Sequence, residues 1–155
     1  MLINSNIRKS IKKTKKIKKK FNSTPFENIK EKLNFNLTKD QLNAINDINN
    51  DLSSDRKMFR LLQGDVGSGK TIVALVCCLN VINSNFQASF MAPTEILAIQ
   101  HYELAKQLFG KNITVKLLTS KTDYSERKQI LNDLKNNKID LLVGTHSLFQ
   151  EKIIY

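Results

Sequence analysis

A run of eight residues, GDVGSGKT at positions 64–71, constrains the fold of this chain more than any other feature. It fits the pattern G-x-x-x-x-G-K-[ST] at every fixed position. Three of the five glycines in the chain lie in this run. Residues without a Cβ atom let successive backbone N–H groups turn around phosphate oxygens. The run therefore predicts a loop that binds the phosphates of a nucleoside triphosphate, formed by Gly64, Asp65, Val66, Gly67, Ser68, Gly69, Lys70 and Thr71.

The last two residues of the run are predicted to act on the nucleotide directly. Lys70 would reach the β- and γ-phosphates as a positive charge, and the Thr71 hydroxyl would be a ligand of Mg²⁺. A helix that begins at Lys70 would add the partial positive charge of its N-terminus. The sequence thus predicts ATP and Mg²⁺ as cofactors, with Lys70 and Thr71 as the catalytic residues of this loop. A glycine-rich turn that matches the pattern by chance is the alternative.

The sequence after the phosphate loop lacks one element of an ATP-hydrolysing site, an Asp-Glu pair at the end of a strand. Such enzymes also use an acidic residue at the end of a strand, which holds Mg²⁺ and orients the attacking water. No Asp-Glu pair occurs in the sequence, and the apolar residues 140–143 run into Gly144, Thr145 and His146 instead. We therefore expect a truncated ATP-driven motor that retains its nucleotide-binding half.

The positive charge of the chain is concentrated at its N-terminus. The formal net charge is +11, but residues 1–20 contain nine basic and no acidic residues, which leaves 16 basic against 14 acidic residues in the rest. The turn-forming residues 22–25 then end this segment. We expect a basic linker segment at residues 1–24 and a partial ATP-binding domain at residues 25–155. A solvated helix, a contact with nucleic-acid phosphate and a membrane-surface helix are the three interpretations of the basic segment.

Composition also bears on the cellular compartment. The longest apolar run, residues 72–79, is well short of the ~20 residues that a membrane-spanning helix needs. No apolar segment of the kind found in signal peptides follows the basic N-terminus. Cys77 and Cys78 are adjacent in an apolar stretch, and they are predicted to fill core space as free thiols. We expect a cytoplasmic protein without a membrane partner.

Strand and helix patterns alternate after a first helix that starts near Thr38. Strands are predicted at residues 59–62, 87–91, 114–118 and 141–143, with helices at residues 70–82, 95–109 and 124–135 between them. This order predicts an α/β fold with a parallel sheet covered by helices on both faces. The C-terminal ends of parallel strands meet at one edge, where ligands bind. Every short polar motif of the chain falls at that edge.

Three side chains outside the phosphate loop allow more than one interpretation. Gln41 could pair with the adenine N6 and N7 atoms, or close a helix start as the partner of Thr38 in a capping box. Thr94 could hold a DNA phosphate at the start of a helix, or simply cap that helix. For His146, a structural role is favoured over that of a general base. His101 is expected to pack on a helix face.

At these motifs the chain resembles the first motor domain of the RecG branched-DNA helicase family, a group of superfamily two translocases. The resemblance lies in Leu61-Leu62-Gln63 with the phosphate loop, in residues 91–98 and 100–102, and in residues 144–150. It extends to the basic N-terminal segment and to the stretch from Leu37 to Gln41. The motor of the transcription-repair coupling factor is similar, but it usually has phenylalanine where Ser68 stands and threonine where Glu95 stands. The primosomal helicase is more distant.

The resemblance implies a RecA-like P-loop NTPase domain and an activity. The parent protein would be an ATP-dependent helicase that remodels branched DNA, stalled forks and Holliday junctions in repair and recombination. Its second motor domain, its acidic strand end and its DNA-wedge domain would lie outside this chain. Gln41 would bind adenine, and DNA would follow Pro93, Thr94, Thr119, Ser120, Thr145 and His146. The chain departs from the family pattern at Ser120, usually glycine, and at Ile99, commonly acidic.

A binding module without catalysis is the alternative function. In that case the same domain would hold a nucleotide or nucleic-acid phosphate and do nothing further. For the parent protein the resemblance favours the enzyme, and for this chain alone the binding module is closer to our expectation.

Overall fold

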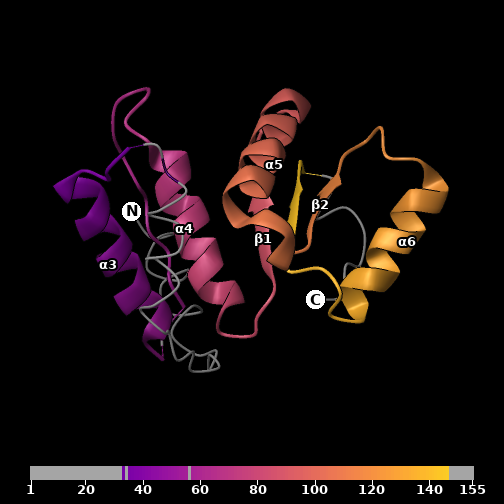
Figure 1. Cartoon of the computed structure of the whole chain (residues 1–155), viewed down its shortest axis with the longest axis horizontal. Coiled ribbons are helices and arrows are strands. Elements are labelled where there is room, and N and C mark those ends of the chain that lie inside the picture. Colours follow the sequence, from indigo (N-terminus) through magenta and orange to yellow (C-terminus); the bar gives the residue numbers. More distant parts are fainter. Residues whose placement is uncertain (1–32, 34, 56, 147–155) are drawn as a thin grey trace, which may run out of the picture.

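The computed structural model describes residue 33, residues 35–55 and residues 57–146 of the chain. Its elements follow one another as α3 (Lys39–Ser53), α4 (Lys70–Ile82), β1 (Ala88–Met91), α5 (Glu95–Phe109), the short 3₁₀ helix η1 (Gly110–Asn112), β2 (Val115–Leu118), α6 (Tyr124–Lys135) and β3 (Leu141–Gly144) (Figure 1). The predicted basic segment at residues 1–24 lies outside the described residues, as does the chain after residue 146. None of the described helices combines the length and the apolar character that crossing a membrane requires.

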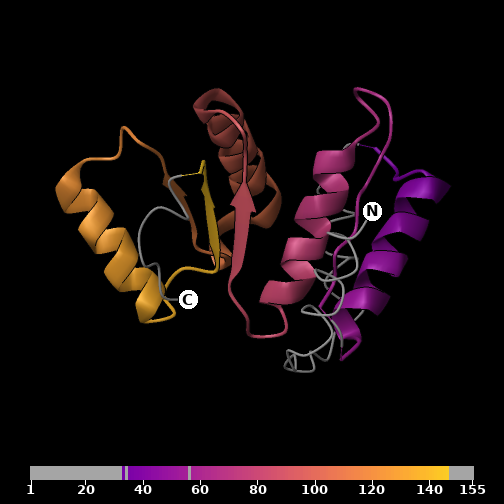
Figure 2. The same ribbon diagram turned by 180° about the vertical axis from the view of Figure 1, so that it is seen from behind.

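The three strands form one parallel sheet in the order β1-β3-β2. In this register Gly144 lies between Met91 and Leu118, so the three strands end at the same level. The loops after β1 and β2 leave at this edge (Figures 1 and 2), and Thr145 and His146 follow β3 there. The α/β fold with a parallel sheet is therefore confirmed, and it brings the loops after residues 91, 118 and 144 together.

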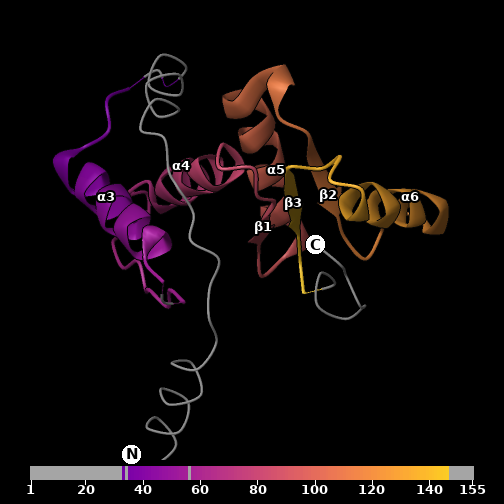
Figure 3. The same cartoon turned by 90° about the horizontal axis from the view of Figure 1, so that it is seen from below.

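Two hydrophobic clusters pack against opposite faces of the sheet. Because successive strand residues point to opposite faces, Leu141 and Val143 belong to the larger cluster, whereas Leu142 belongs to the smaller one. The larger cluster joins the sheet to α3, α4 and α5, and the smaller one joins it to α6 (Figure 3). All four residues of β3 are buried, as expected for the central strand of a sheet covered on both faces.

Side-chain caps fix the starts of two helices. Thr38 and Gln41 form the predicted capping box of α3, in which Thr38 Oγ1 accepts a hydrogen bond from the Gln41 amide and Gln41 Oε1 accepts one from the Thr38 amide. At α5, Thr94 Oγ1 accepts a hydrogen bond from the Leu97 amide. The capping interpretations of Gln41 and Thr94 are thus confirmed.

The predicted strand at residues 59–62 is wrong for the described structure. Residues 57–64 have no regular secondary structure, and Phe59 and Leu61 are 74% and 86% exposed. A strand needs a neighbour for its backbone hydrogen bonds, and none of the three strands of the described sheet pairs with this segment. The alternation of side chains is nevertheless that of a strand, because Met58 and Leu62 pack against the larger cluster.

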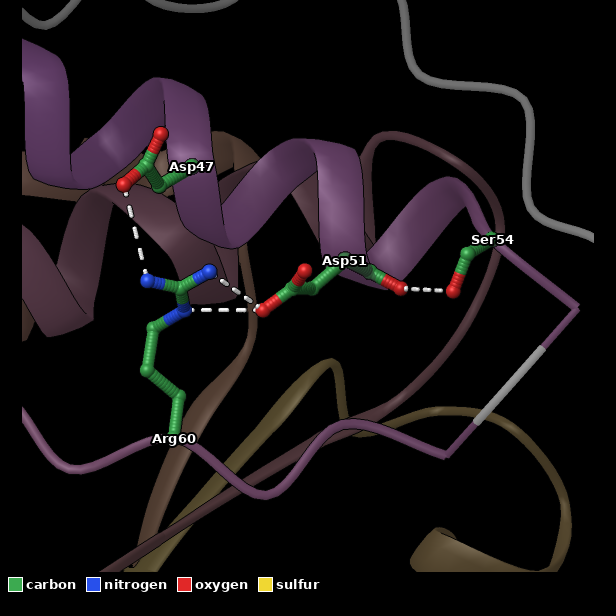
Figure 4. A network of polar contacts seen from close by, with 4 residues as sticks. All are labelled: Asp47, Asp51, Ser54 and Arg60. Carbon is green, nitrogen blue, oxygen red and sulfur yellow. Dashed lines mark hydrogen bonds and ion pairs between the residues drawn. The ribbon is translucent and has the colours of Figure 1, made fainter. Parts of the chain in front are cut away.

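Arg60 joins this segment to α3 instead. Its Nε and Nη2 atoms lie 2.8 and 2.7 Å from Asp51 Oδ2, and its Nη1 atom lies 3.5 Å from Asp47 Oδ2 (Figure 4). In the same view, Ser54 Oγ donates a hydrogen bond to the Asp51 carbonyl at the end of the helix. Ion pairs with a helix therefore hold a segment whose sequence reads as a strand.

Candidate functional site

The phosphate loop begins where the segment after α3 meets α4. It lies at the same end of the molecule as the C-terminal ends of the strands, as two opposite views show (Figures 1 and 2). Gly67 and Gly69 have φ angles of 82° and 79°, a left-handed backbone that favours glycine. Gly69 is the N-cap of α4, so the loop leads directly into the N-terminus of that helix. The predicted loop and helix start at Lys70 are therefore present.

The Lys70 side chain turns back into its own loop. Its Nζ atom donates hydrogen bonds to the carbonyl oxygens of Gly64 and Asp65, at 2.8 and 2.6 Å, and to Ser68 Oγ at 3.3 Å. The ammonium group thus lies inside the ring of residues that the sequence pattern assigns to phosphate. An incoming phosphate group has to draw the ammonium from these carbonyls, which are weaker partners than charged oxygens.

Gln41 connects α3 to this loop. While its Oε1 atom belongs to the capping box, its Nε2 atom donates a 2.9 Å hydrogen bond to the Ser68 carbonyl. A Cβ atom at Gly69 would collide with the same Nε2 atom. The φ angle therefore favours glycine at position 69, and any side chain there would also have to displace the Gln41 amide.

A cavity of about 370 Å³ lies between α3 and the loop. Lys70, Ser68 and Gly64 of the loop line it together with Gln41 of α3. Its apolar wall is formed by Ala44, Leu62 and Val73. Small-ligand sites typically combine such an apolar wall with polar groups that orient the ligand. The structure therefore joins Gln41 and Lys70, which are 29 positions apart in the sequence, in one cavity.

A magnesium ion would find one protein ligand here. Thr71, partly buried at the second position of α4, offers a hydroxyl oxygen. Among the described residues, no group of three or more His, Cys, Asp or Glu side chains could hold a metal ion. This set fits Mg²⁺ only together with a nucleotide, because the ion can take its remaining oxygen ligands from phosphates and water.

The strand-end edge carries the residues predicted to follow DNA. Pro93 and Thr94, after β1, are exposed, and so is Ser120 after β2. His146 is exposed and Thr145 partly buried after β3. Ala92, immediately before Pro93, donates a 2.9 Å hydrogen bond to the Gly144 carbonyl, which joins two of these loops.

Thr119 differs from the others, because it is only 4% exposed. Its Oγ1 atom donates a 3.0 Å hydrogen bond to Glu95 Oε1 of α5. Lys121, close by, forms an ion pair with Glu95 Oε2 at 3.3 Å. Sequence reasoning missed Glu95 and Lys121 as parts of this edge. The only signal for Glu95 was its place directly after the helix cap Thr94.

The remaining candidates for chemistry are packing residues. Burial raises the pKa of the Cys77 thiol to about 12, with a smaller contribution from the neighbouring Cys78, and burial raises the pKa of Cys78 to about 12 as well. Both thiols therefore remain protonated at neutral pH and are neither nucleophiles nor metal ligands. Burial lowers the pKa of His101, whose ring packs edge-on against Phe90 with 5.1 Å between the centroids.

Known proteins resemble this chain over most of its length. The DEAD/DEAH box helicase family matches residues 38–154. The ATP-dependent DNA helicase RecG of Thermotoga maritima is 46% identical over 148 residues, which are 95% of this chain and 19% of that protein. RecG of Staphylococcus aureus strain NCTC 8325 is 46% identical over 125 residues, 81% of this chain and 18% of the relative.

A solved structure gives the same result. The structure of RecG bound to a three-way DNA junction matches with a TM-score of 0.93 and 44% sequence identity, over 99% of this chain and 21% of that chain. This chain thus spans about a fifth of the length of the relatives it matches.

Proposed function

Because this chain belongs to the DEAD/DEAH box helicase family, we propose that it is the nucleotide-binding part of a RecG-like ATP-dependent DNA helicase. The parent enzyme would remodel branched DNA, such as stalled forks and Holliday junctions, in repair and recombination. Three features support this: the identity to RecG proteins, the likeness to RecG on a three-way DNA junction, and the phosphate loop. The motor of the transcription-repair coupling factor remains the alternative within the same superfamily.

We propose that ATP binds in the cavity between α3 and the phosphate loop. The single observation that carries this proposal is the placement of the Lys70 ammonium inside the loop, within 2.8 Å of two loop carbonyls. The β- and γ-phosphates would replace the Gly64 and Asp65 carbonyls as partners of Lys70 Nζ. Residues 64–71 would surround these phosphates. Gln41, which lines the same cavity, would face the adenine. Adenine binding requires the Gln41 amide to leave Ser68 or to share its hydrogen bonds.

Mg²⁺ would enter with the nucleotide. The Thr71 hydroxyl would hold it, together with phosphate oxygens and water. When bound, the ion neutralises phosphate charge. We further propose a cytoplasmic location, and the division into a basic segment at residues 1–24 and a nucleotide-binding part from residue 25 onward.

DNA would follow the strand-end edge of the sheet. Pro93, Thr94, Ser120, Thr145 and His146 line that edge as exposed or partly buried residues. The hydroxyl of Thr94 already caps α5, so a phosphate there would be held mainly by N–H groups of the helix start. Thr119 belongs to the same edge, but its buried hydroxyl donates its hydrogen bond to Glu95.

Substitution of Lys70 tests the nucleotide site. Lys70→Ala removes the charge inside the loop and leaves the glycine backbone and Thr71 in place. Since a hydrogen bond to a charged group contributes about 1.5–3 kcal/mol, we expect ATP affinity to fall roughly ten- to hundredfold. Titration of a fluorescent ATP analogue with Mg²⁺ measures this loss, and circular dichroism checks that both proteins are folded.

Lys111→Ala is the matched control, because it removes the same charge from the 3₁₀ helix η1. It should bind the analogue like the wild type. Equal affinity of folded Lys70→Ala and wild type would mean that residues 64–71 do not bind phosphate in this chain.

A binding module without catalysis is the second candidate function. The absence of any Asp-Glu pair from the sequence favours it for this chain alone. The two candidates share the nucleotide site and differ in whether phosphate is released.

A further inference from the structure

A buried hydroxyl ties the loop after β2 to the first residue of α5. Thr119 is 4% exposed, and its Oγ1 atom lies 3.0 Å from Glu95 Oε1. The two residues belong to segments that follow different strands, β2 and β1, at the common strand-end edge. Their hydrogen bond therefore fixes one of these loops relative to the helix start of another.

The same hydroxyl organises the loop itself. Thr119 Oγ1 accepts a hydrogen bond from the Lys121 amide at 3.3 Å while it donates to Glu95. The Thr119 amide donates to Thr122 Oγ1 at 3.0 Å, and the Thr122 amide donates to the Thr119 carbonyl at 3.3 Å. Residues 119–122 thus form a tight turn. The Thr119 hydroxyl that organises this turn donates its own hydrogen bond to Glu95, outside the turn.

The second oxygen of Glu95 has a different partner. Its Oε2 atom lies 3.3 Å from Lys121 Nζ, so the two carboxylate oxygens divide between the loop hydroxyl and the loop cation. The side chain of Glu95 is 23% exposed, whereas that of Lys121 is 82% exposed. An ion pair with so exposed a partner contributes little to stability and is readily exchanged for another anion.

A cavity lies beside this pair, with charged residues of both signs in its lining. Lys116 and Lys121 line this cavity of about 300 Å³, together with Tyr102 and Thr122. Glu126 of α6 is its acidic member. Phosphate oxygens on the strand-end edge would meet Lys121 at this place.

We propose that Glu95 is a positioning residue for DNA, a proposal that rests on the function proposed above. Through Thr119 it fixes the turn 119–122, and through its second oxygen it holds Lys121 at the strand-end edge. A DNA phosphate takes Lys121 from Glu95, while the hydrogen bond to Thr119 persists. Lys121 is therefore a phosphate contact, and Glu95 competes with DNA for it.

Two substitutions of Glu95 separate its two roles. Glu95→Gln keeps an oxygen that accepts from Thr119 but removes the charge that holds Lys121, so junction affinity should rise about two- to fivefold. Glu95→Ala removes both interactions and should bind less tightly than Glu95→Gln. Lys121→Ala should weaken binding and reduce the slope of log affinity against log salt by about 0.9. Fluorescence anisotropy of a labelled three-way DNA junction, at several salt concentrations, measures all four proteins.

The chain offers a matched control pair. Lys138 and Asp133 lie 3.8 Å apart with side-chain exposures of 68% and 22%, close to those of Lys121 and Glu95. Lys138 precedes β3 and so lies at the opposite edge of the sheet. Asp133→Asn changes the net charge as Glu95→Gln does, and Lys138→Ala changes it as Lys121→Ala does. Neither control should alter the salt slope, or change the affinity for the junction by more than the effect of one distant charge.

Hydrogen exchange of the Lys121 amide supplies a measurement that needs no DNA. Exchange should be faster in Glu95→Ala and Thr119→Val than in the wild type, and close to wild type in Glu95→Gln. Unchanged exchange in Glu95→Ala would overturn the positioning role, whatever the DNA result. If the wild type binds the junction but Glu95→Gln binds no more tightly, the competition for Lys121 is overturned. Failure of the wild type to bind the junction would overturn the proposed DNA function itself, together with the role of Lys121.

Discussion

The two polar atoms of the Gln41 amide make three interactions in this structure. Its Oε1 atom closes the capping box of α3, and its Nε2 atom holds the Ser68 carbonyl. The same Nε2 atom fills the space beside Gly69. Any ligand that draws this amide away therefore changes the packing of the phosphate loop as well.

The glycines of the loop provide a test at this scale. Gly67 and Gly69 both have left-handed φ angles, but only Gly69 faces Gln41, since a Cβ at Gly67 would have nothing within 4 Å. We expect Gly67→Ala to lower the free energy of unfolding by about 1–2 kcal/mol through backbone strain alone. Gly69→Ala should lower it further, and the extra loss should shrink when Gln41→Ala is combined with it. Urea denaturation of the single and double variants measures the coupling. Equal effects of the two glycine substitutions would contradict the predicted collision with Gln41.

Between elements, α3 holds the segment that leads into the phosphate loop. Arg60 reaches two carboxylates of α3, with a short double contact to Asp51 and a longer one to Asp47. The apolar side chains at positions 58 and 62 pack inward on the same segment. Together these contacts set the approach of the chain to Gly64 without a strand at residues 59–62.

The two carboxylates should not contribute equally. Asp51→Ala removes two contacts of 2.7–2.8 Å, whereas Asp47→Ala removes one of 3.5 Å. Both pairs are substantially exposed, so we expect Asp51→Ala to lower the free energy of unfolding by about 0.5–1 kcal/mol and Asp47→Ala by about 0.3 kcal/mol or less. Urea denaturation at low and high salt checks this, because the loss should be smaller at high salt. A larger loss for Asp47→Ala would rule out the geometry around Arg60.

For the whole molecule, the nucleotide loop and the strand-end edge lie at the same end (Figures 1 and 2). α4 and α5 connect them, because both pack on the larger hydrophobic cluster. The two sites therefore share one packed core.

We expect this chain alone to release no phosphate from ATP above background, with or without forked DNA. The sequence contains no Asp-Glu pair, and an arginine finger alone contributes about 10³- to 10⁵-fold to the rate of related enzymes. A coupled phosphate-release assay at saturating ATP measures the rate, with Lys70→Ala as the background. Release that rises on addition of forked DNA and disappears in Lys70→Ala would show that this chain is itself an ATPase.

The sequence by itself determined the elements whose signals are local. The boundaries of the helices at residues 70–82, 95–109 and 124–135 agree with the pattern, because periodicity, caps and the left-handed glycines depend on neighbours within a few positions. The parallel sheet followed from the alternation of strands and helices.

Tertiary structure decided whatever depends on a distant partner. Residues 59–62 have the side-chain alternation of a strand, but they lie against α3 because no described strand supplies their backbone hydrogen bonds. The resemblance assigned Thr119 to the edge predicted to follow DNA, and packing buries its side chain and turns its hydroxyl toward Glu95, 24 positions away. A hydrogen-bond partner so far along the chain leaves no periodic signal, and only the folded molecule shows it.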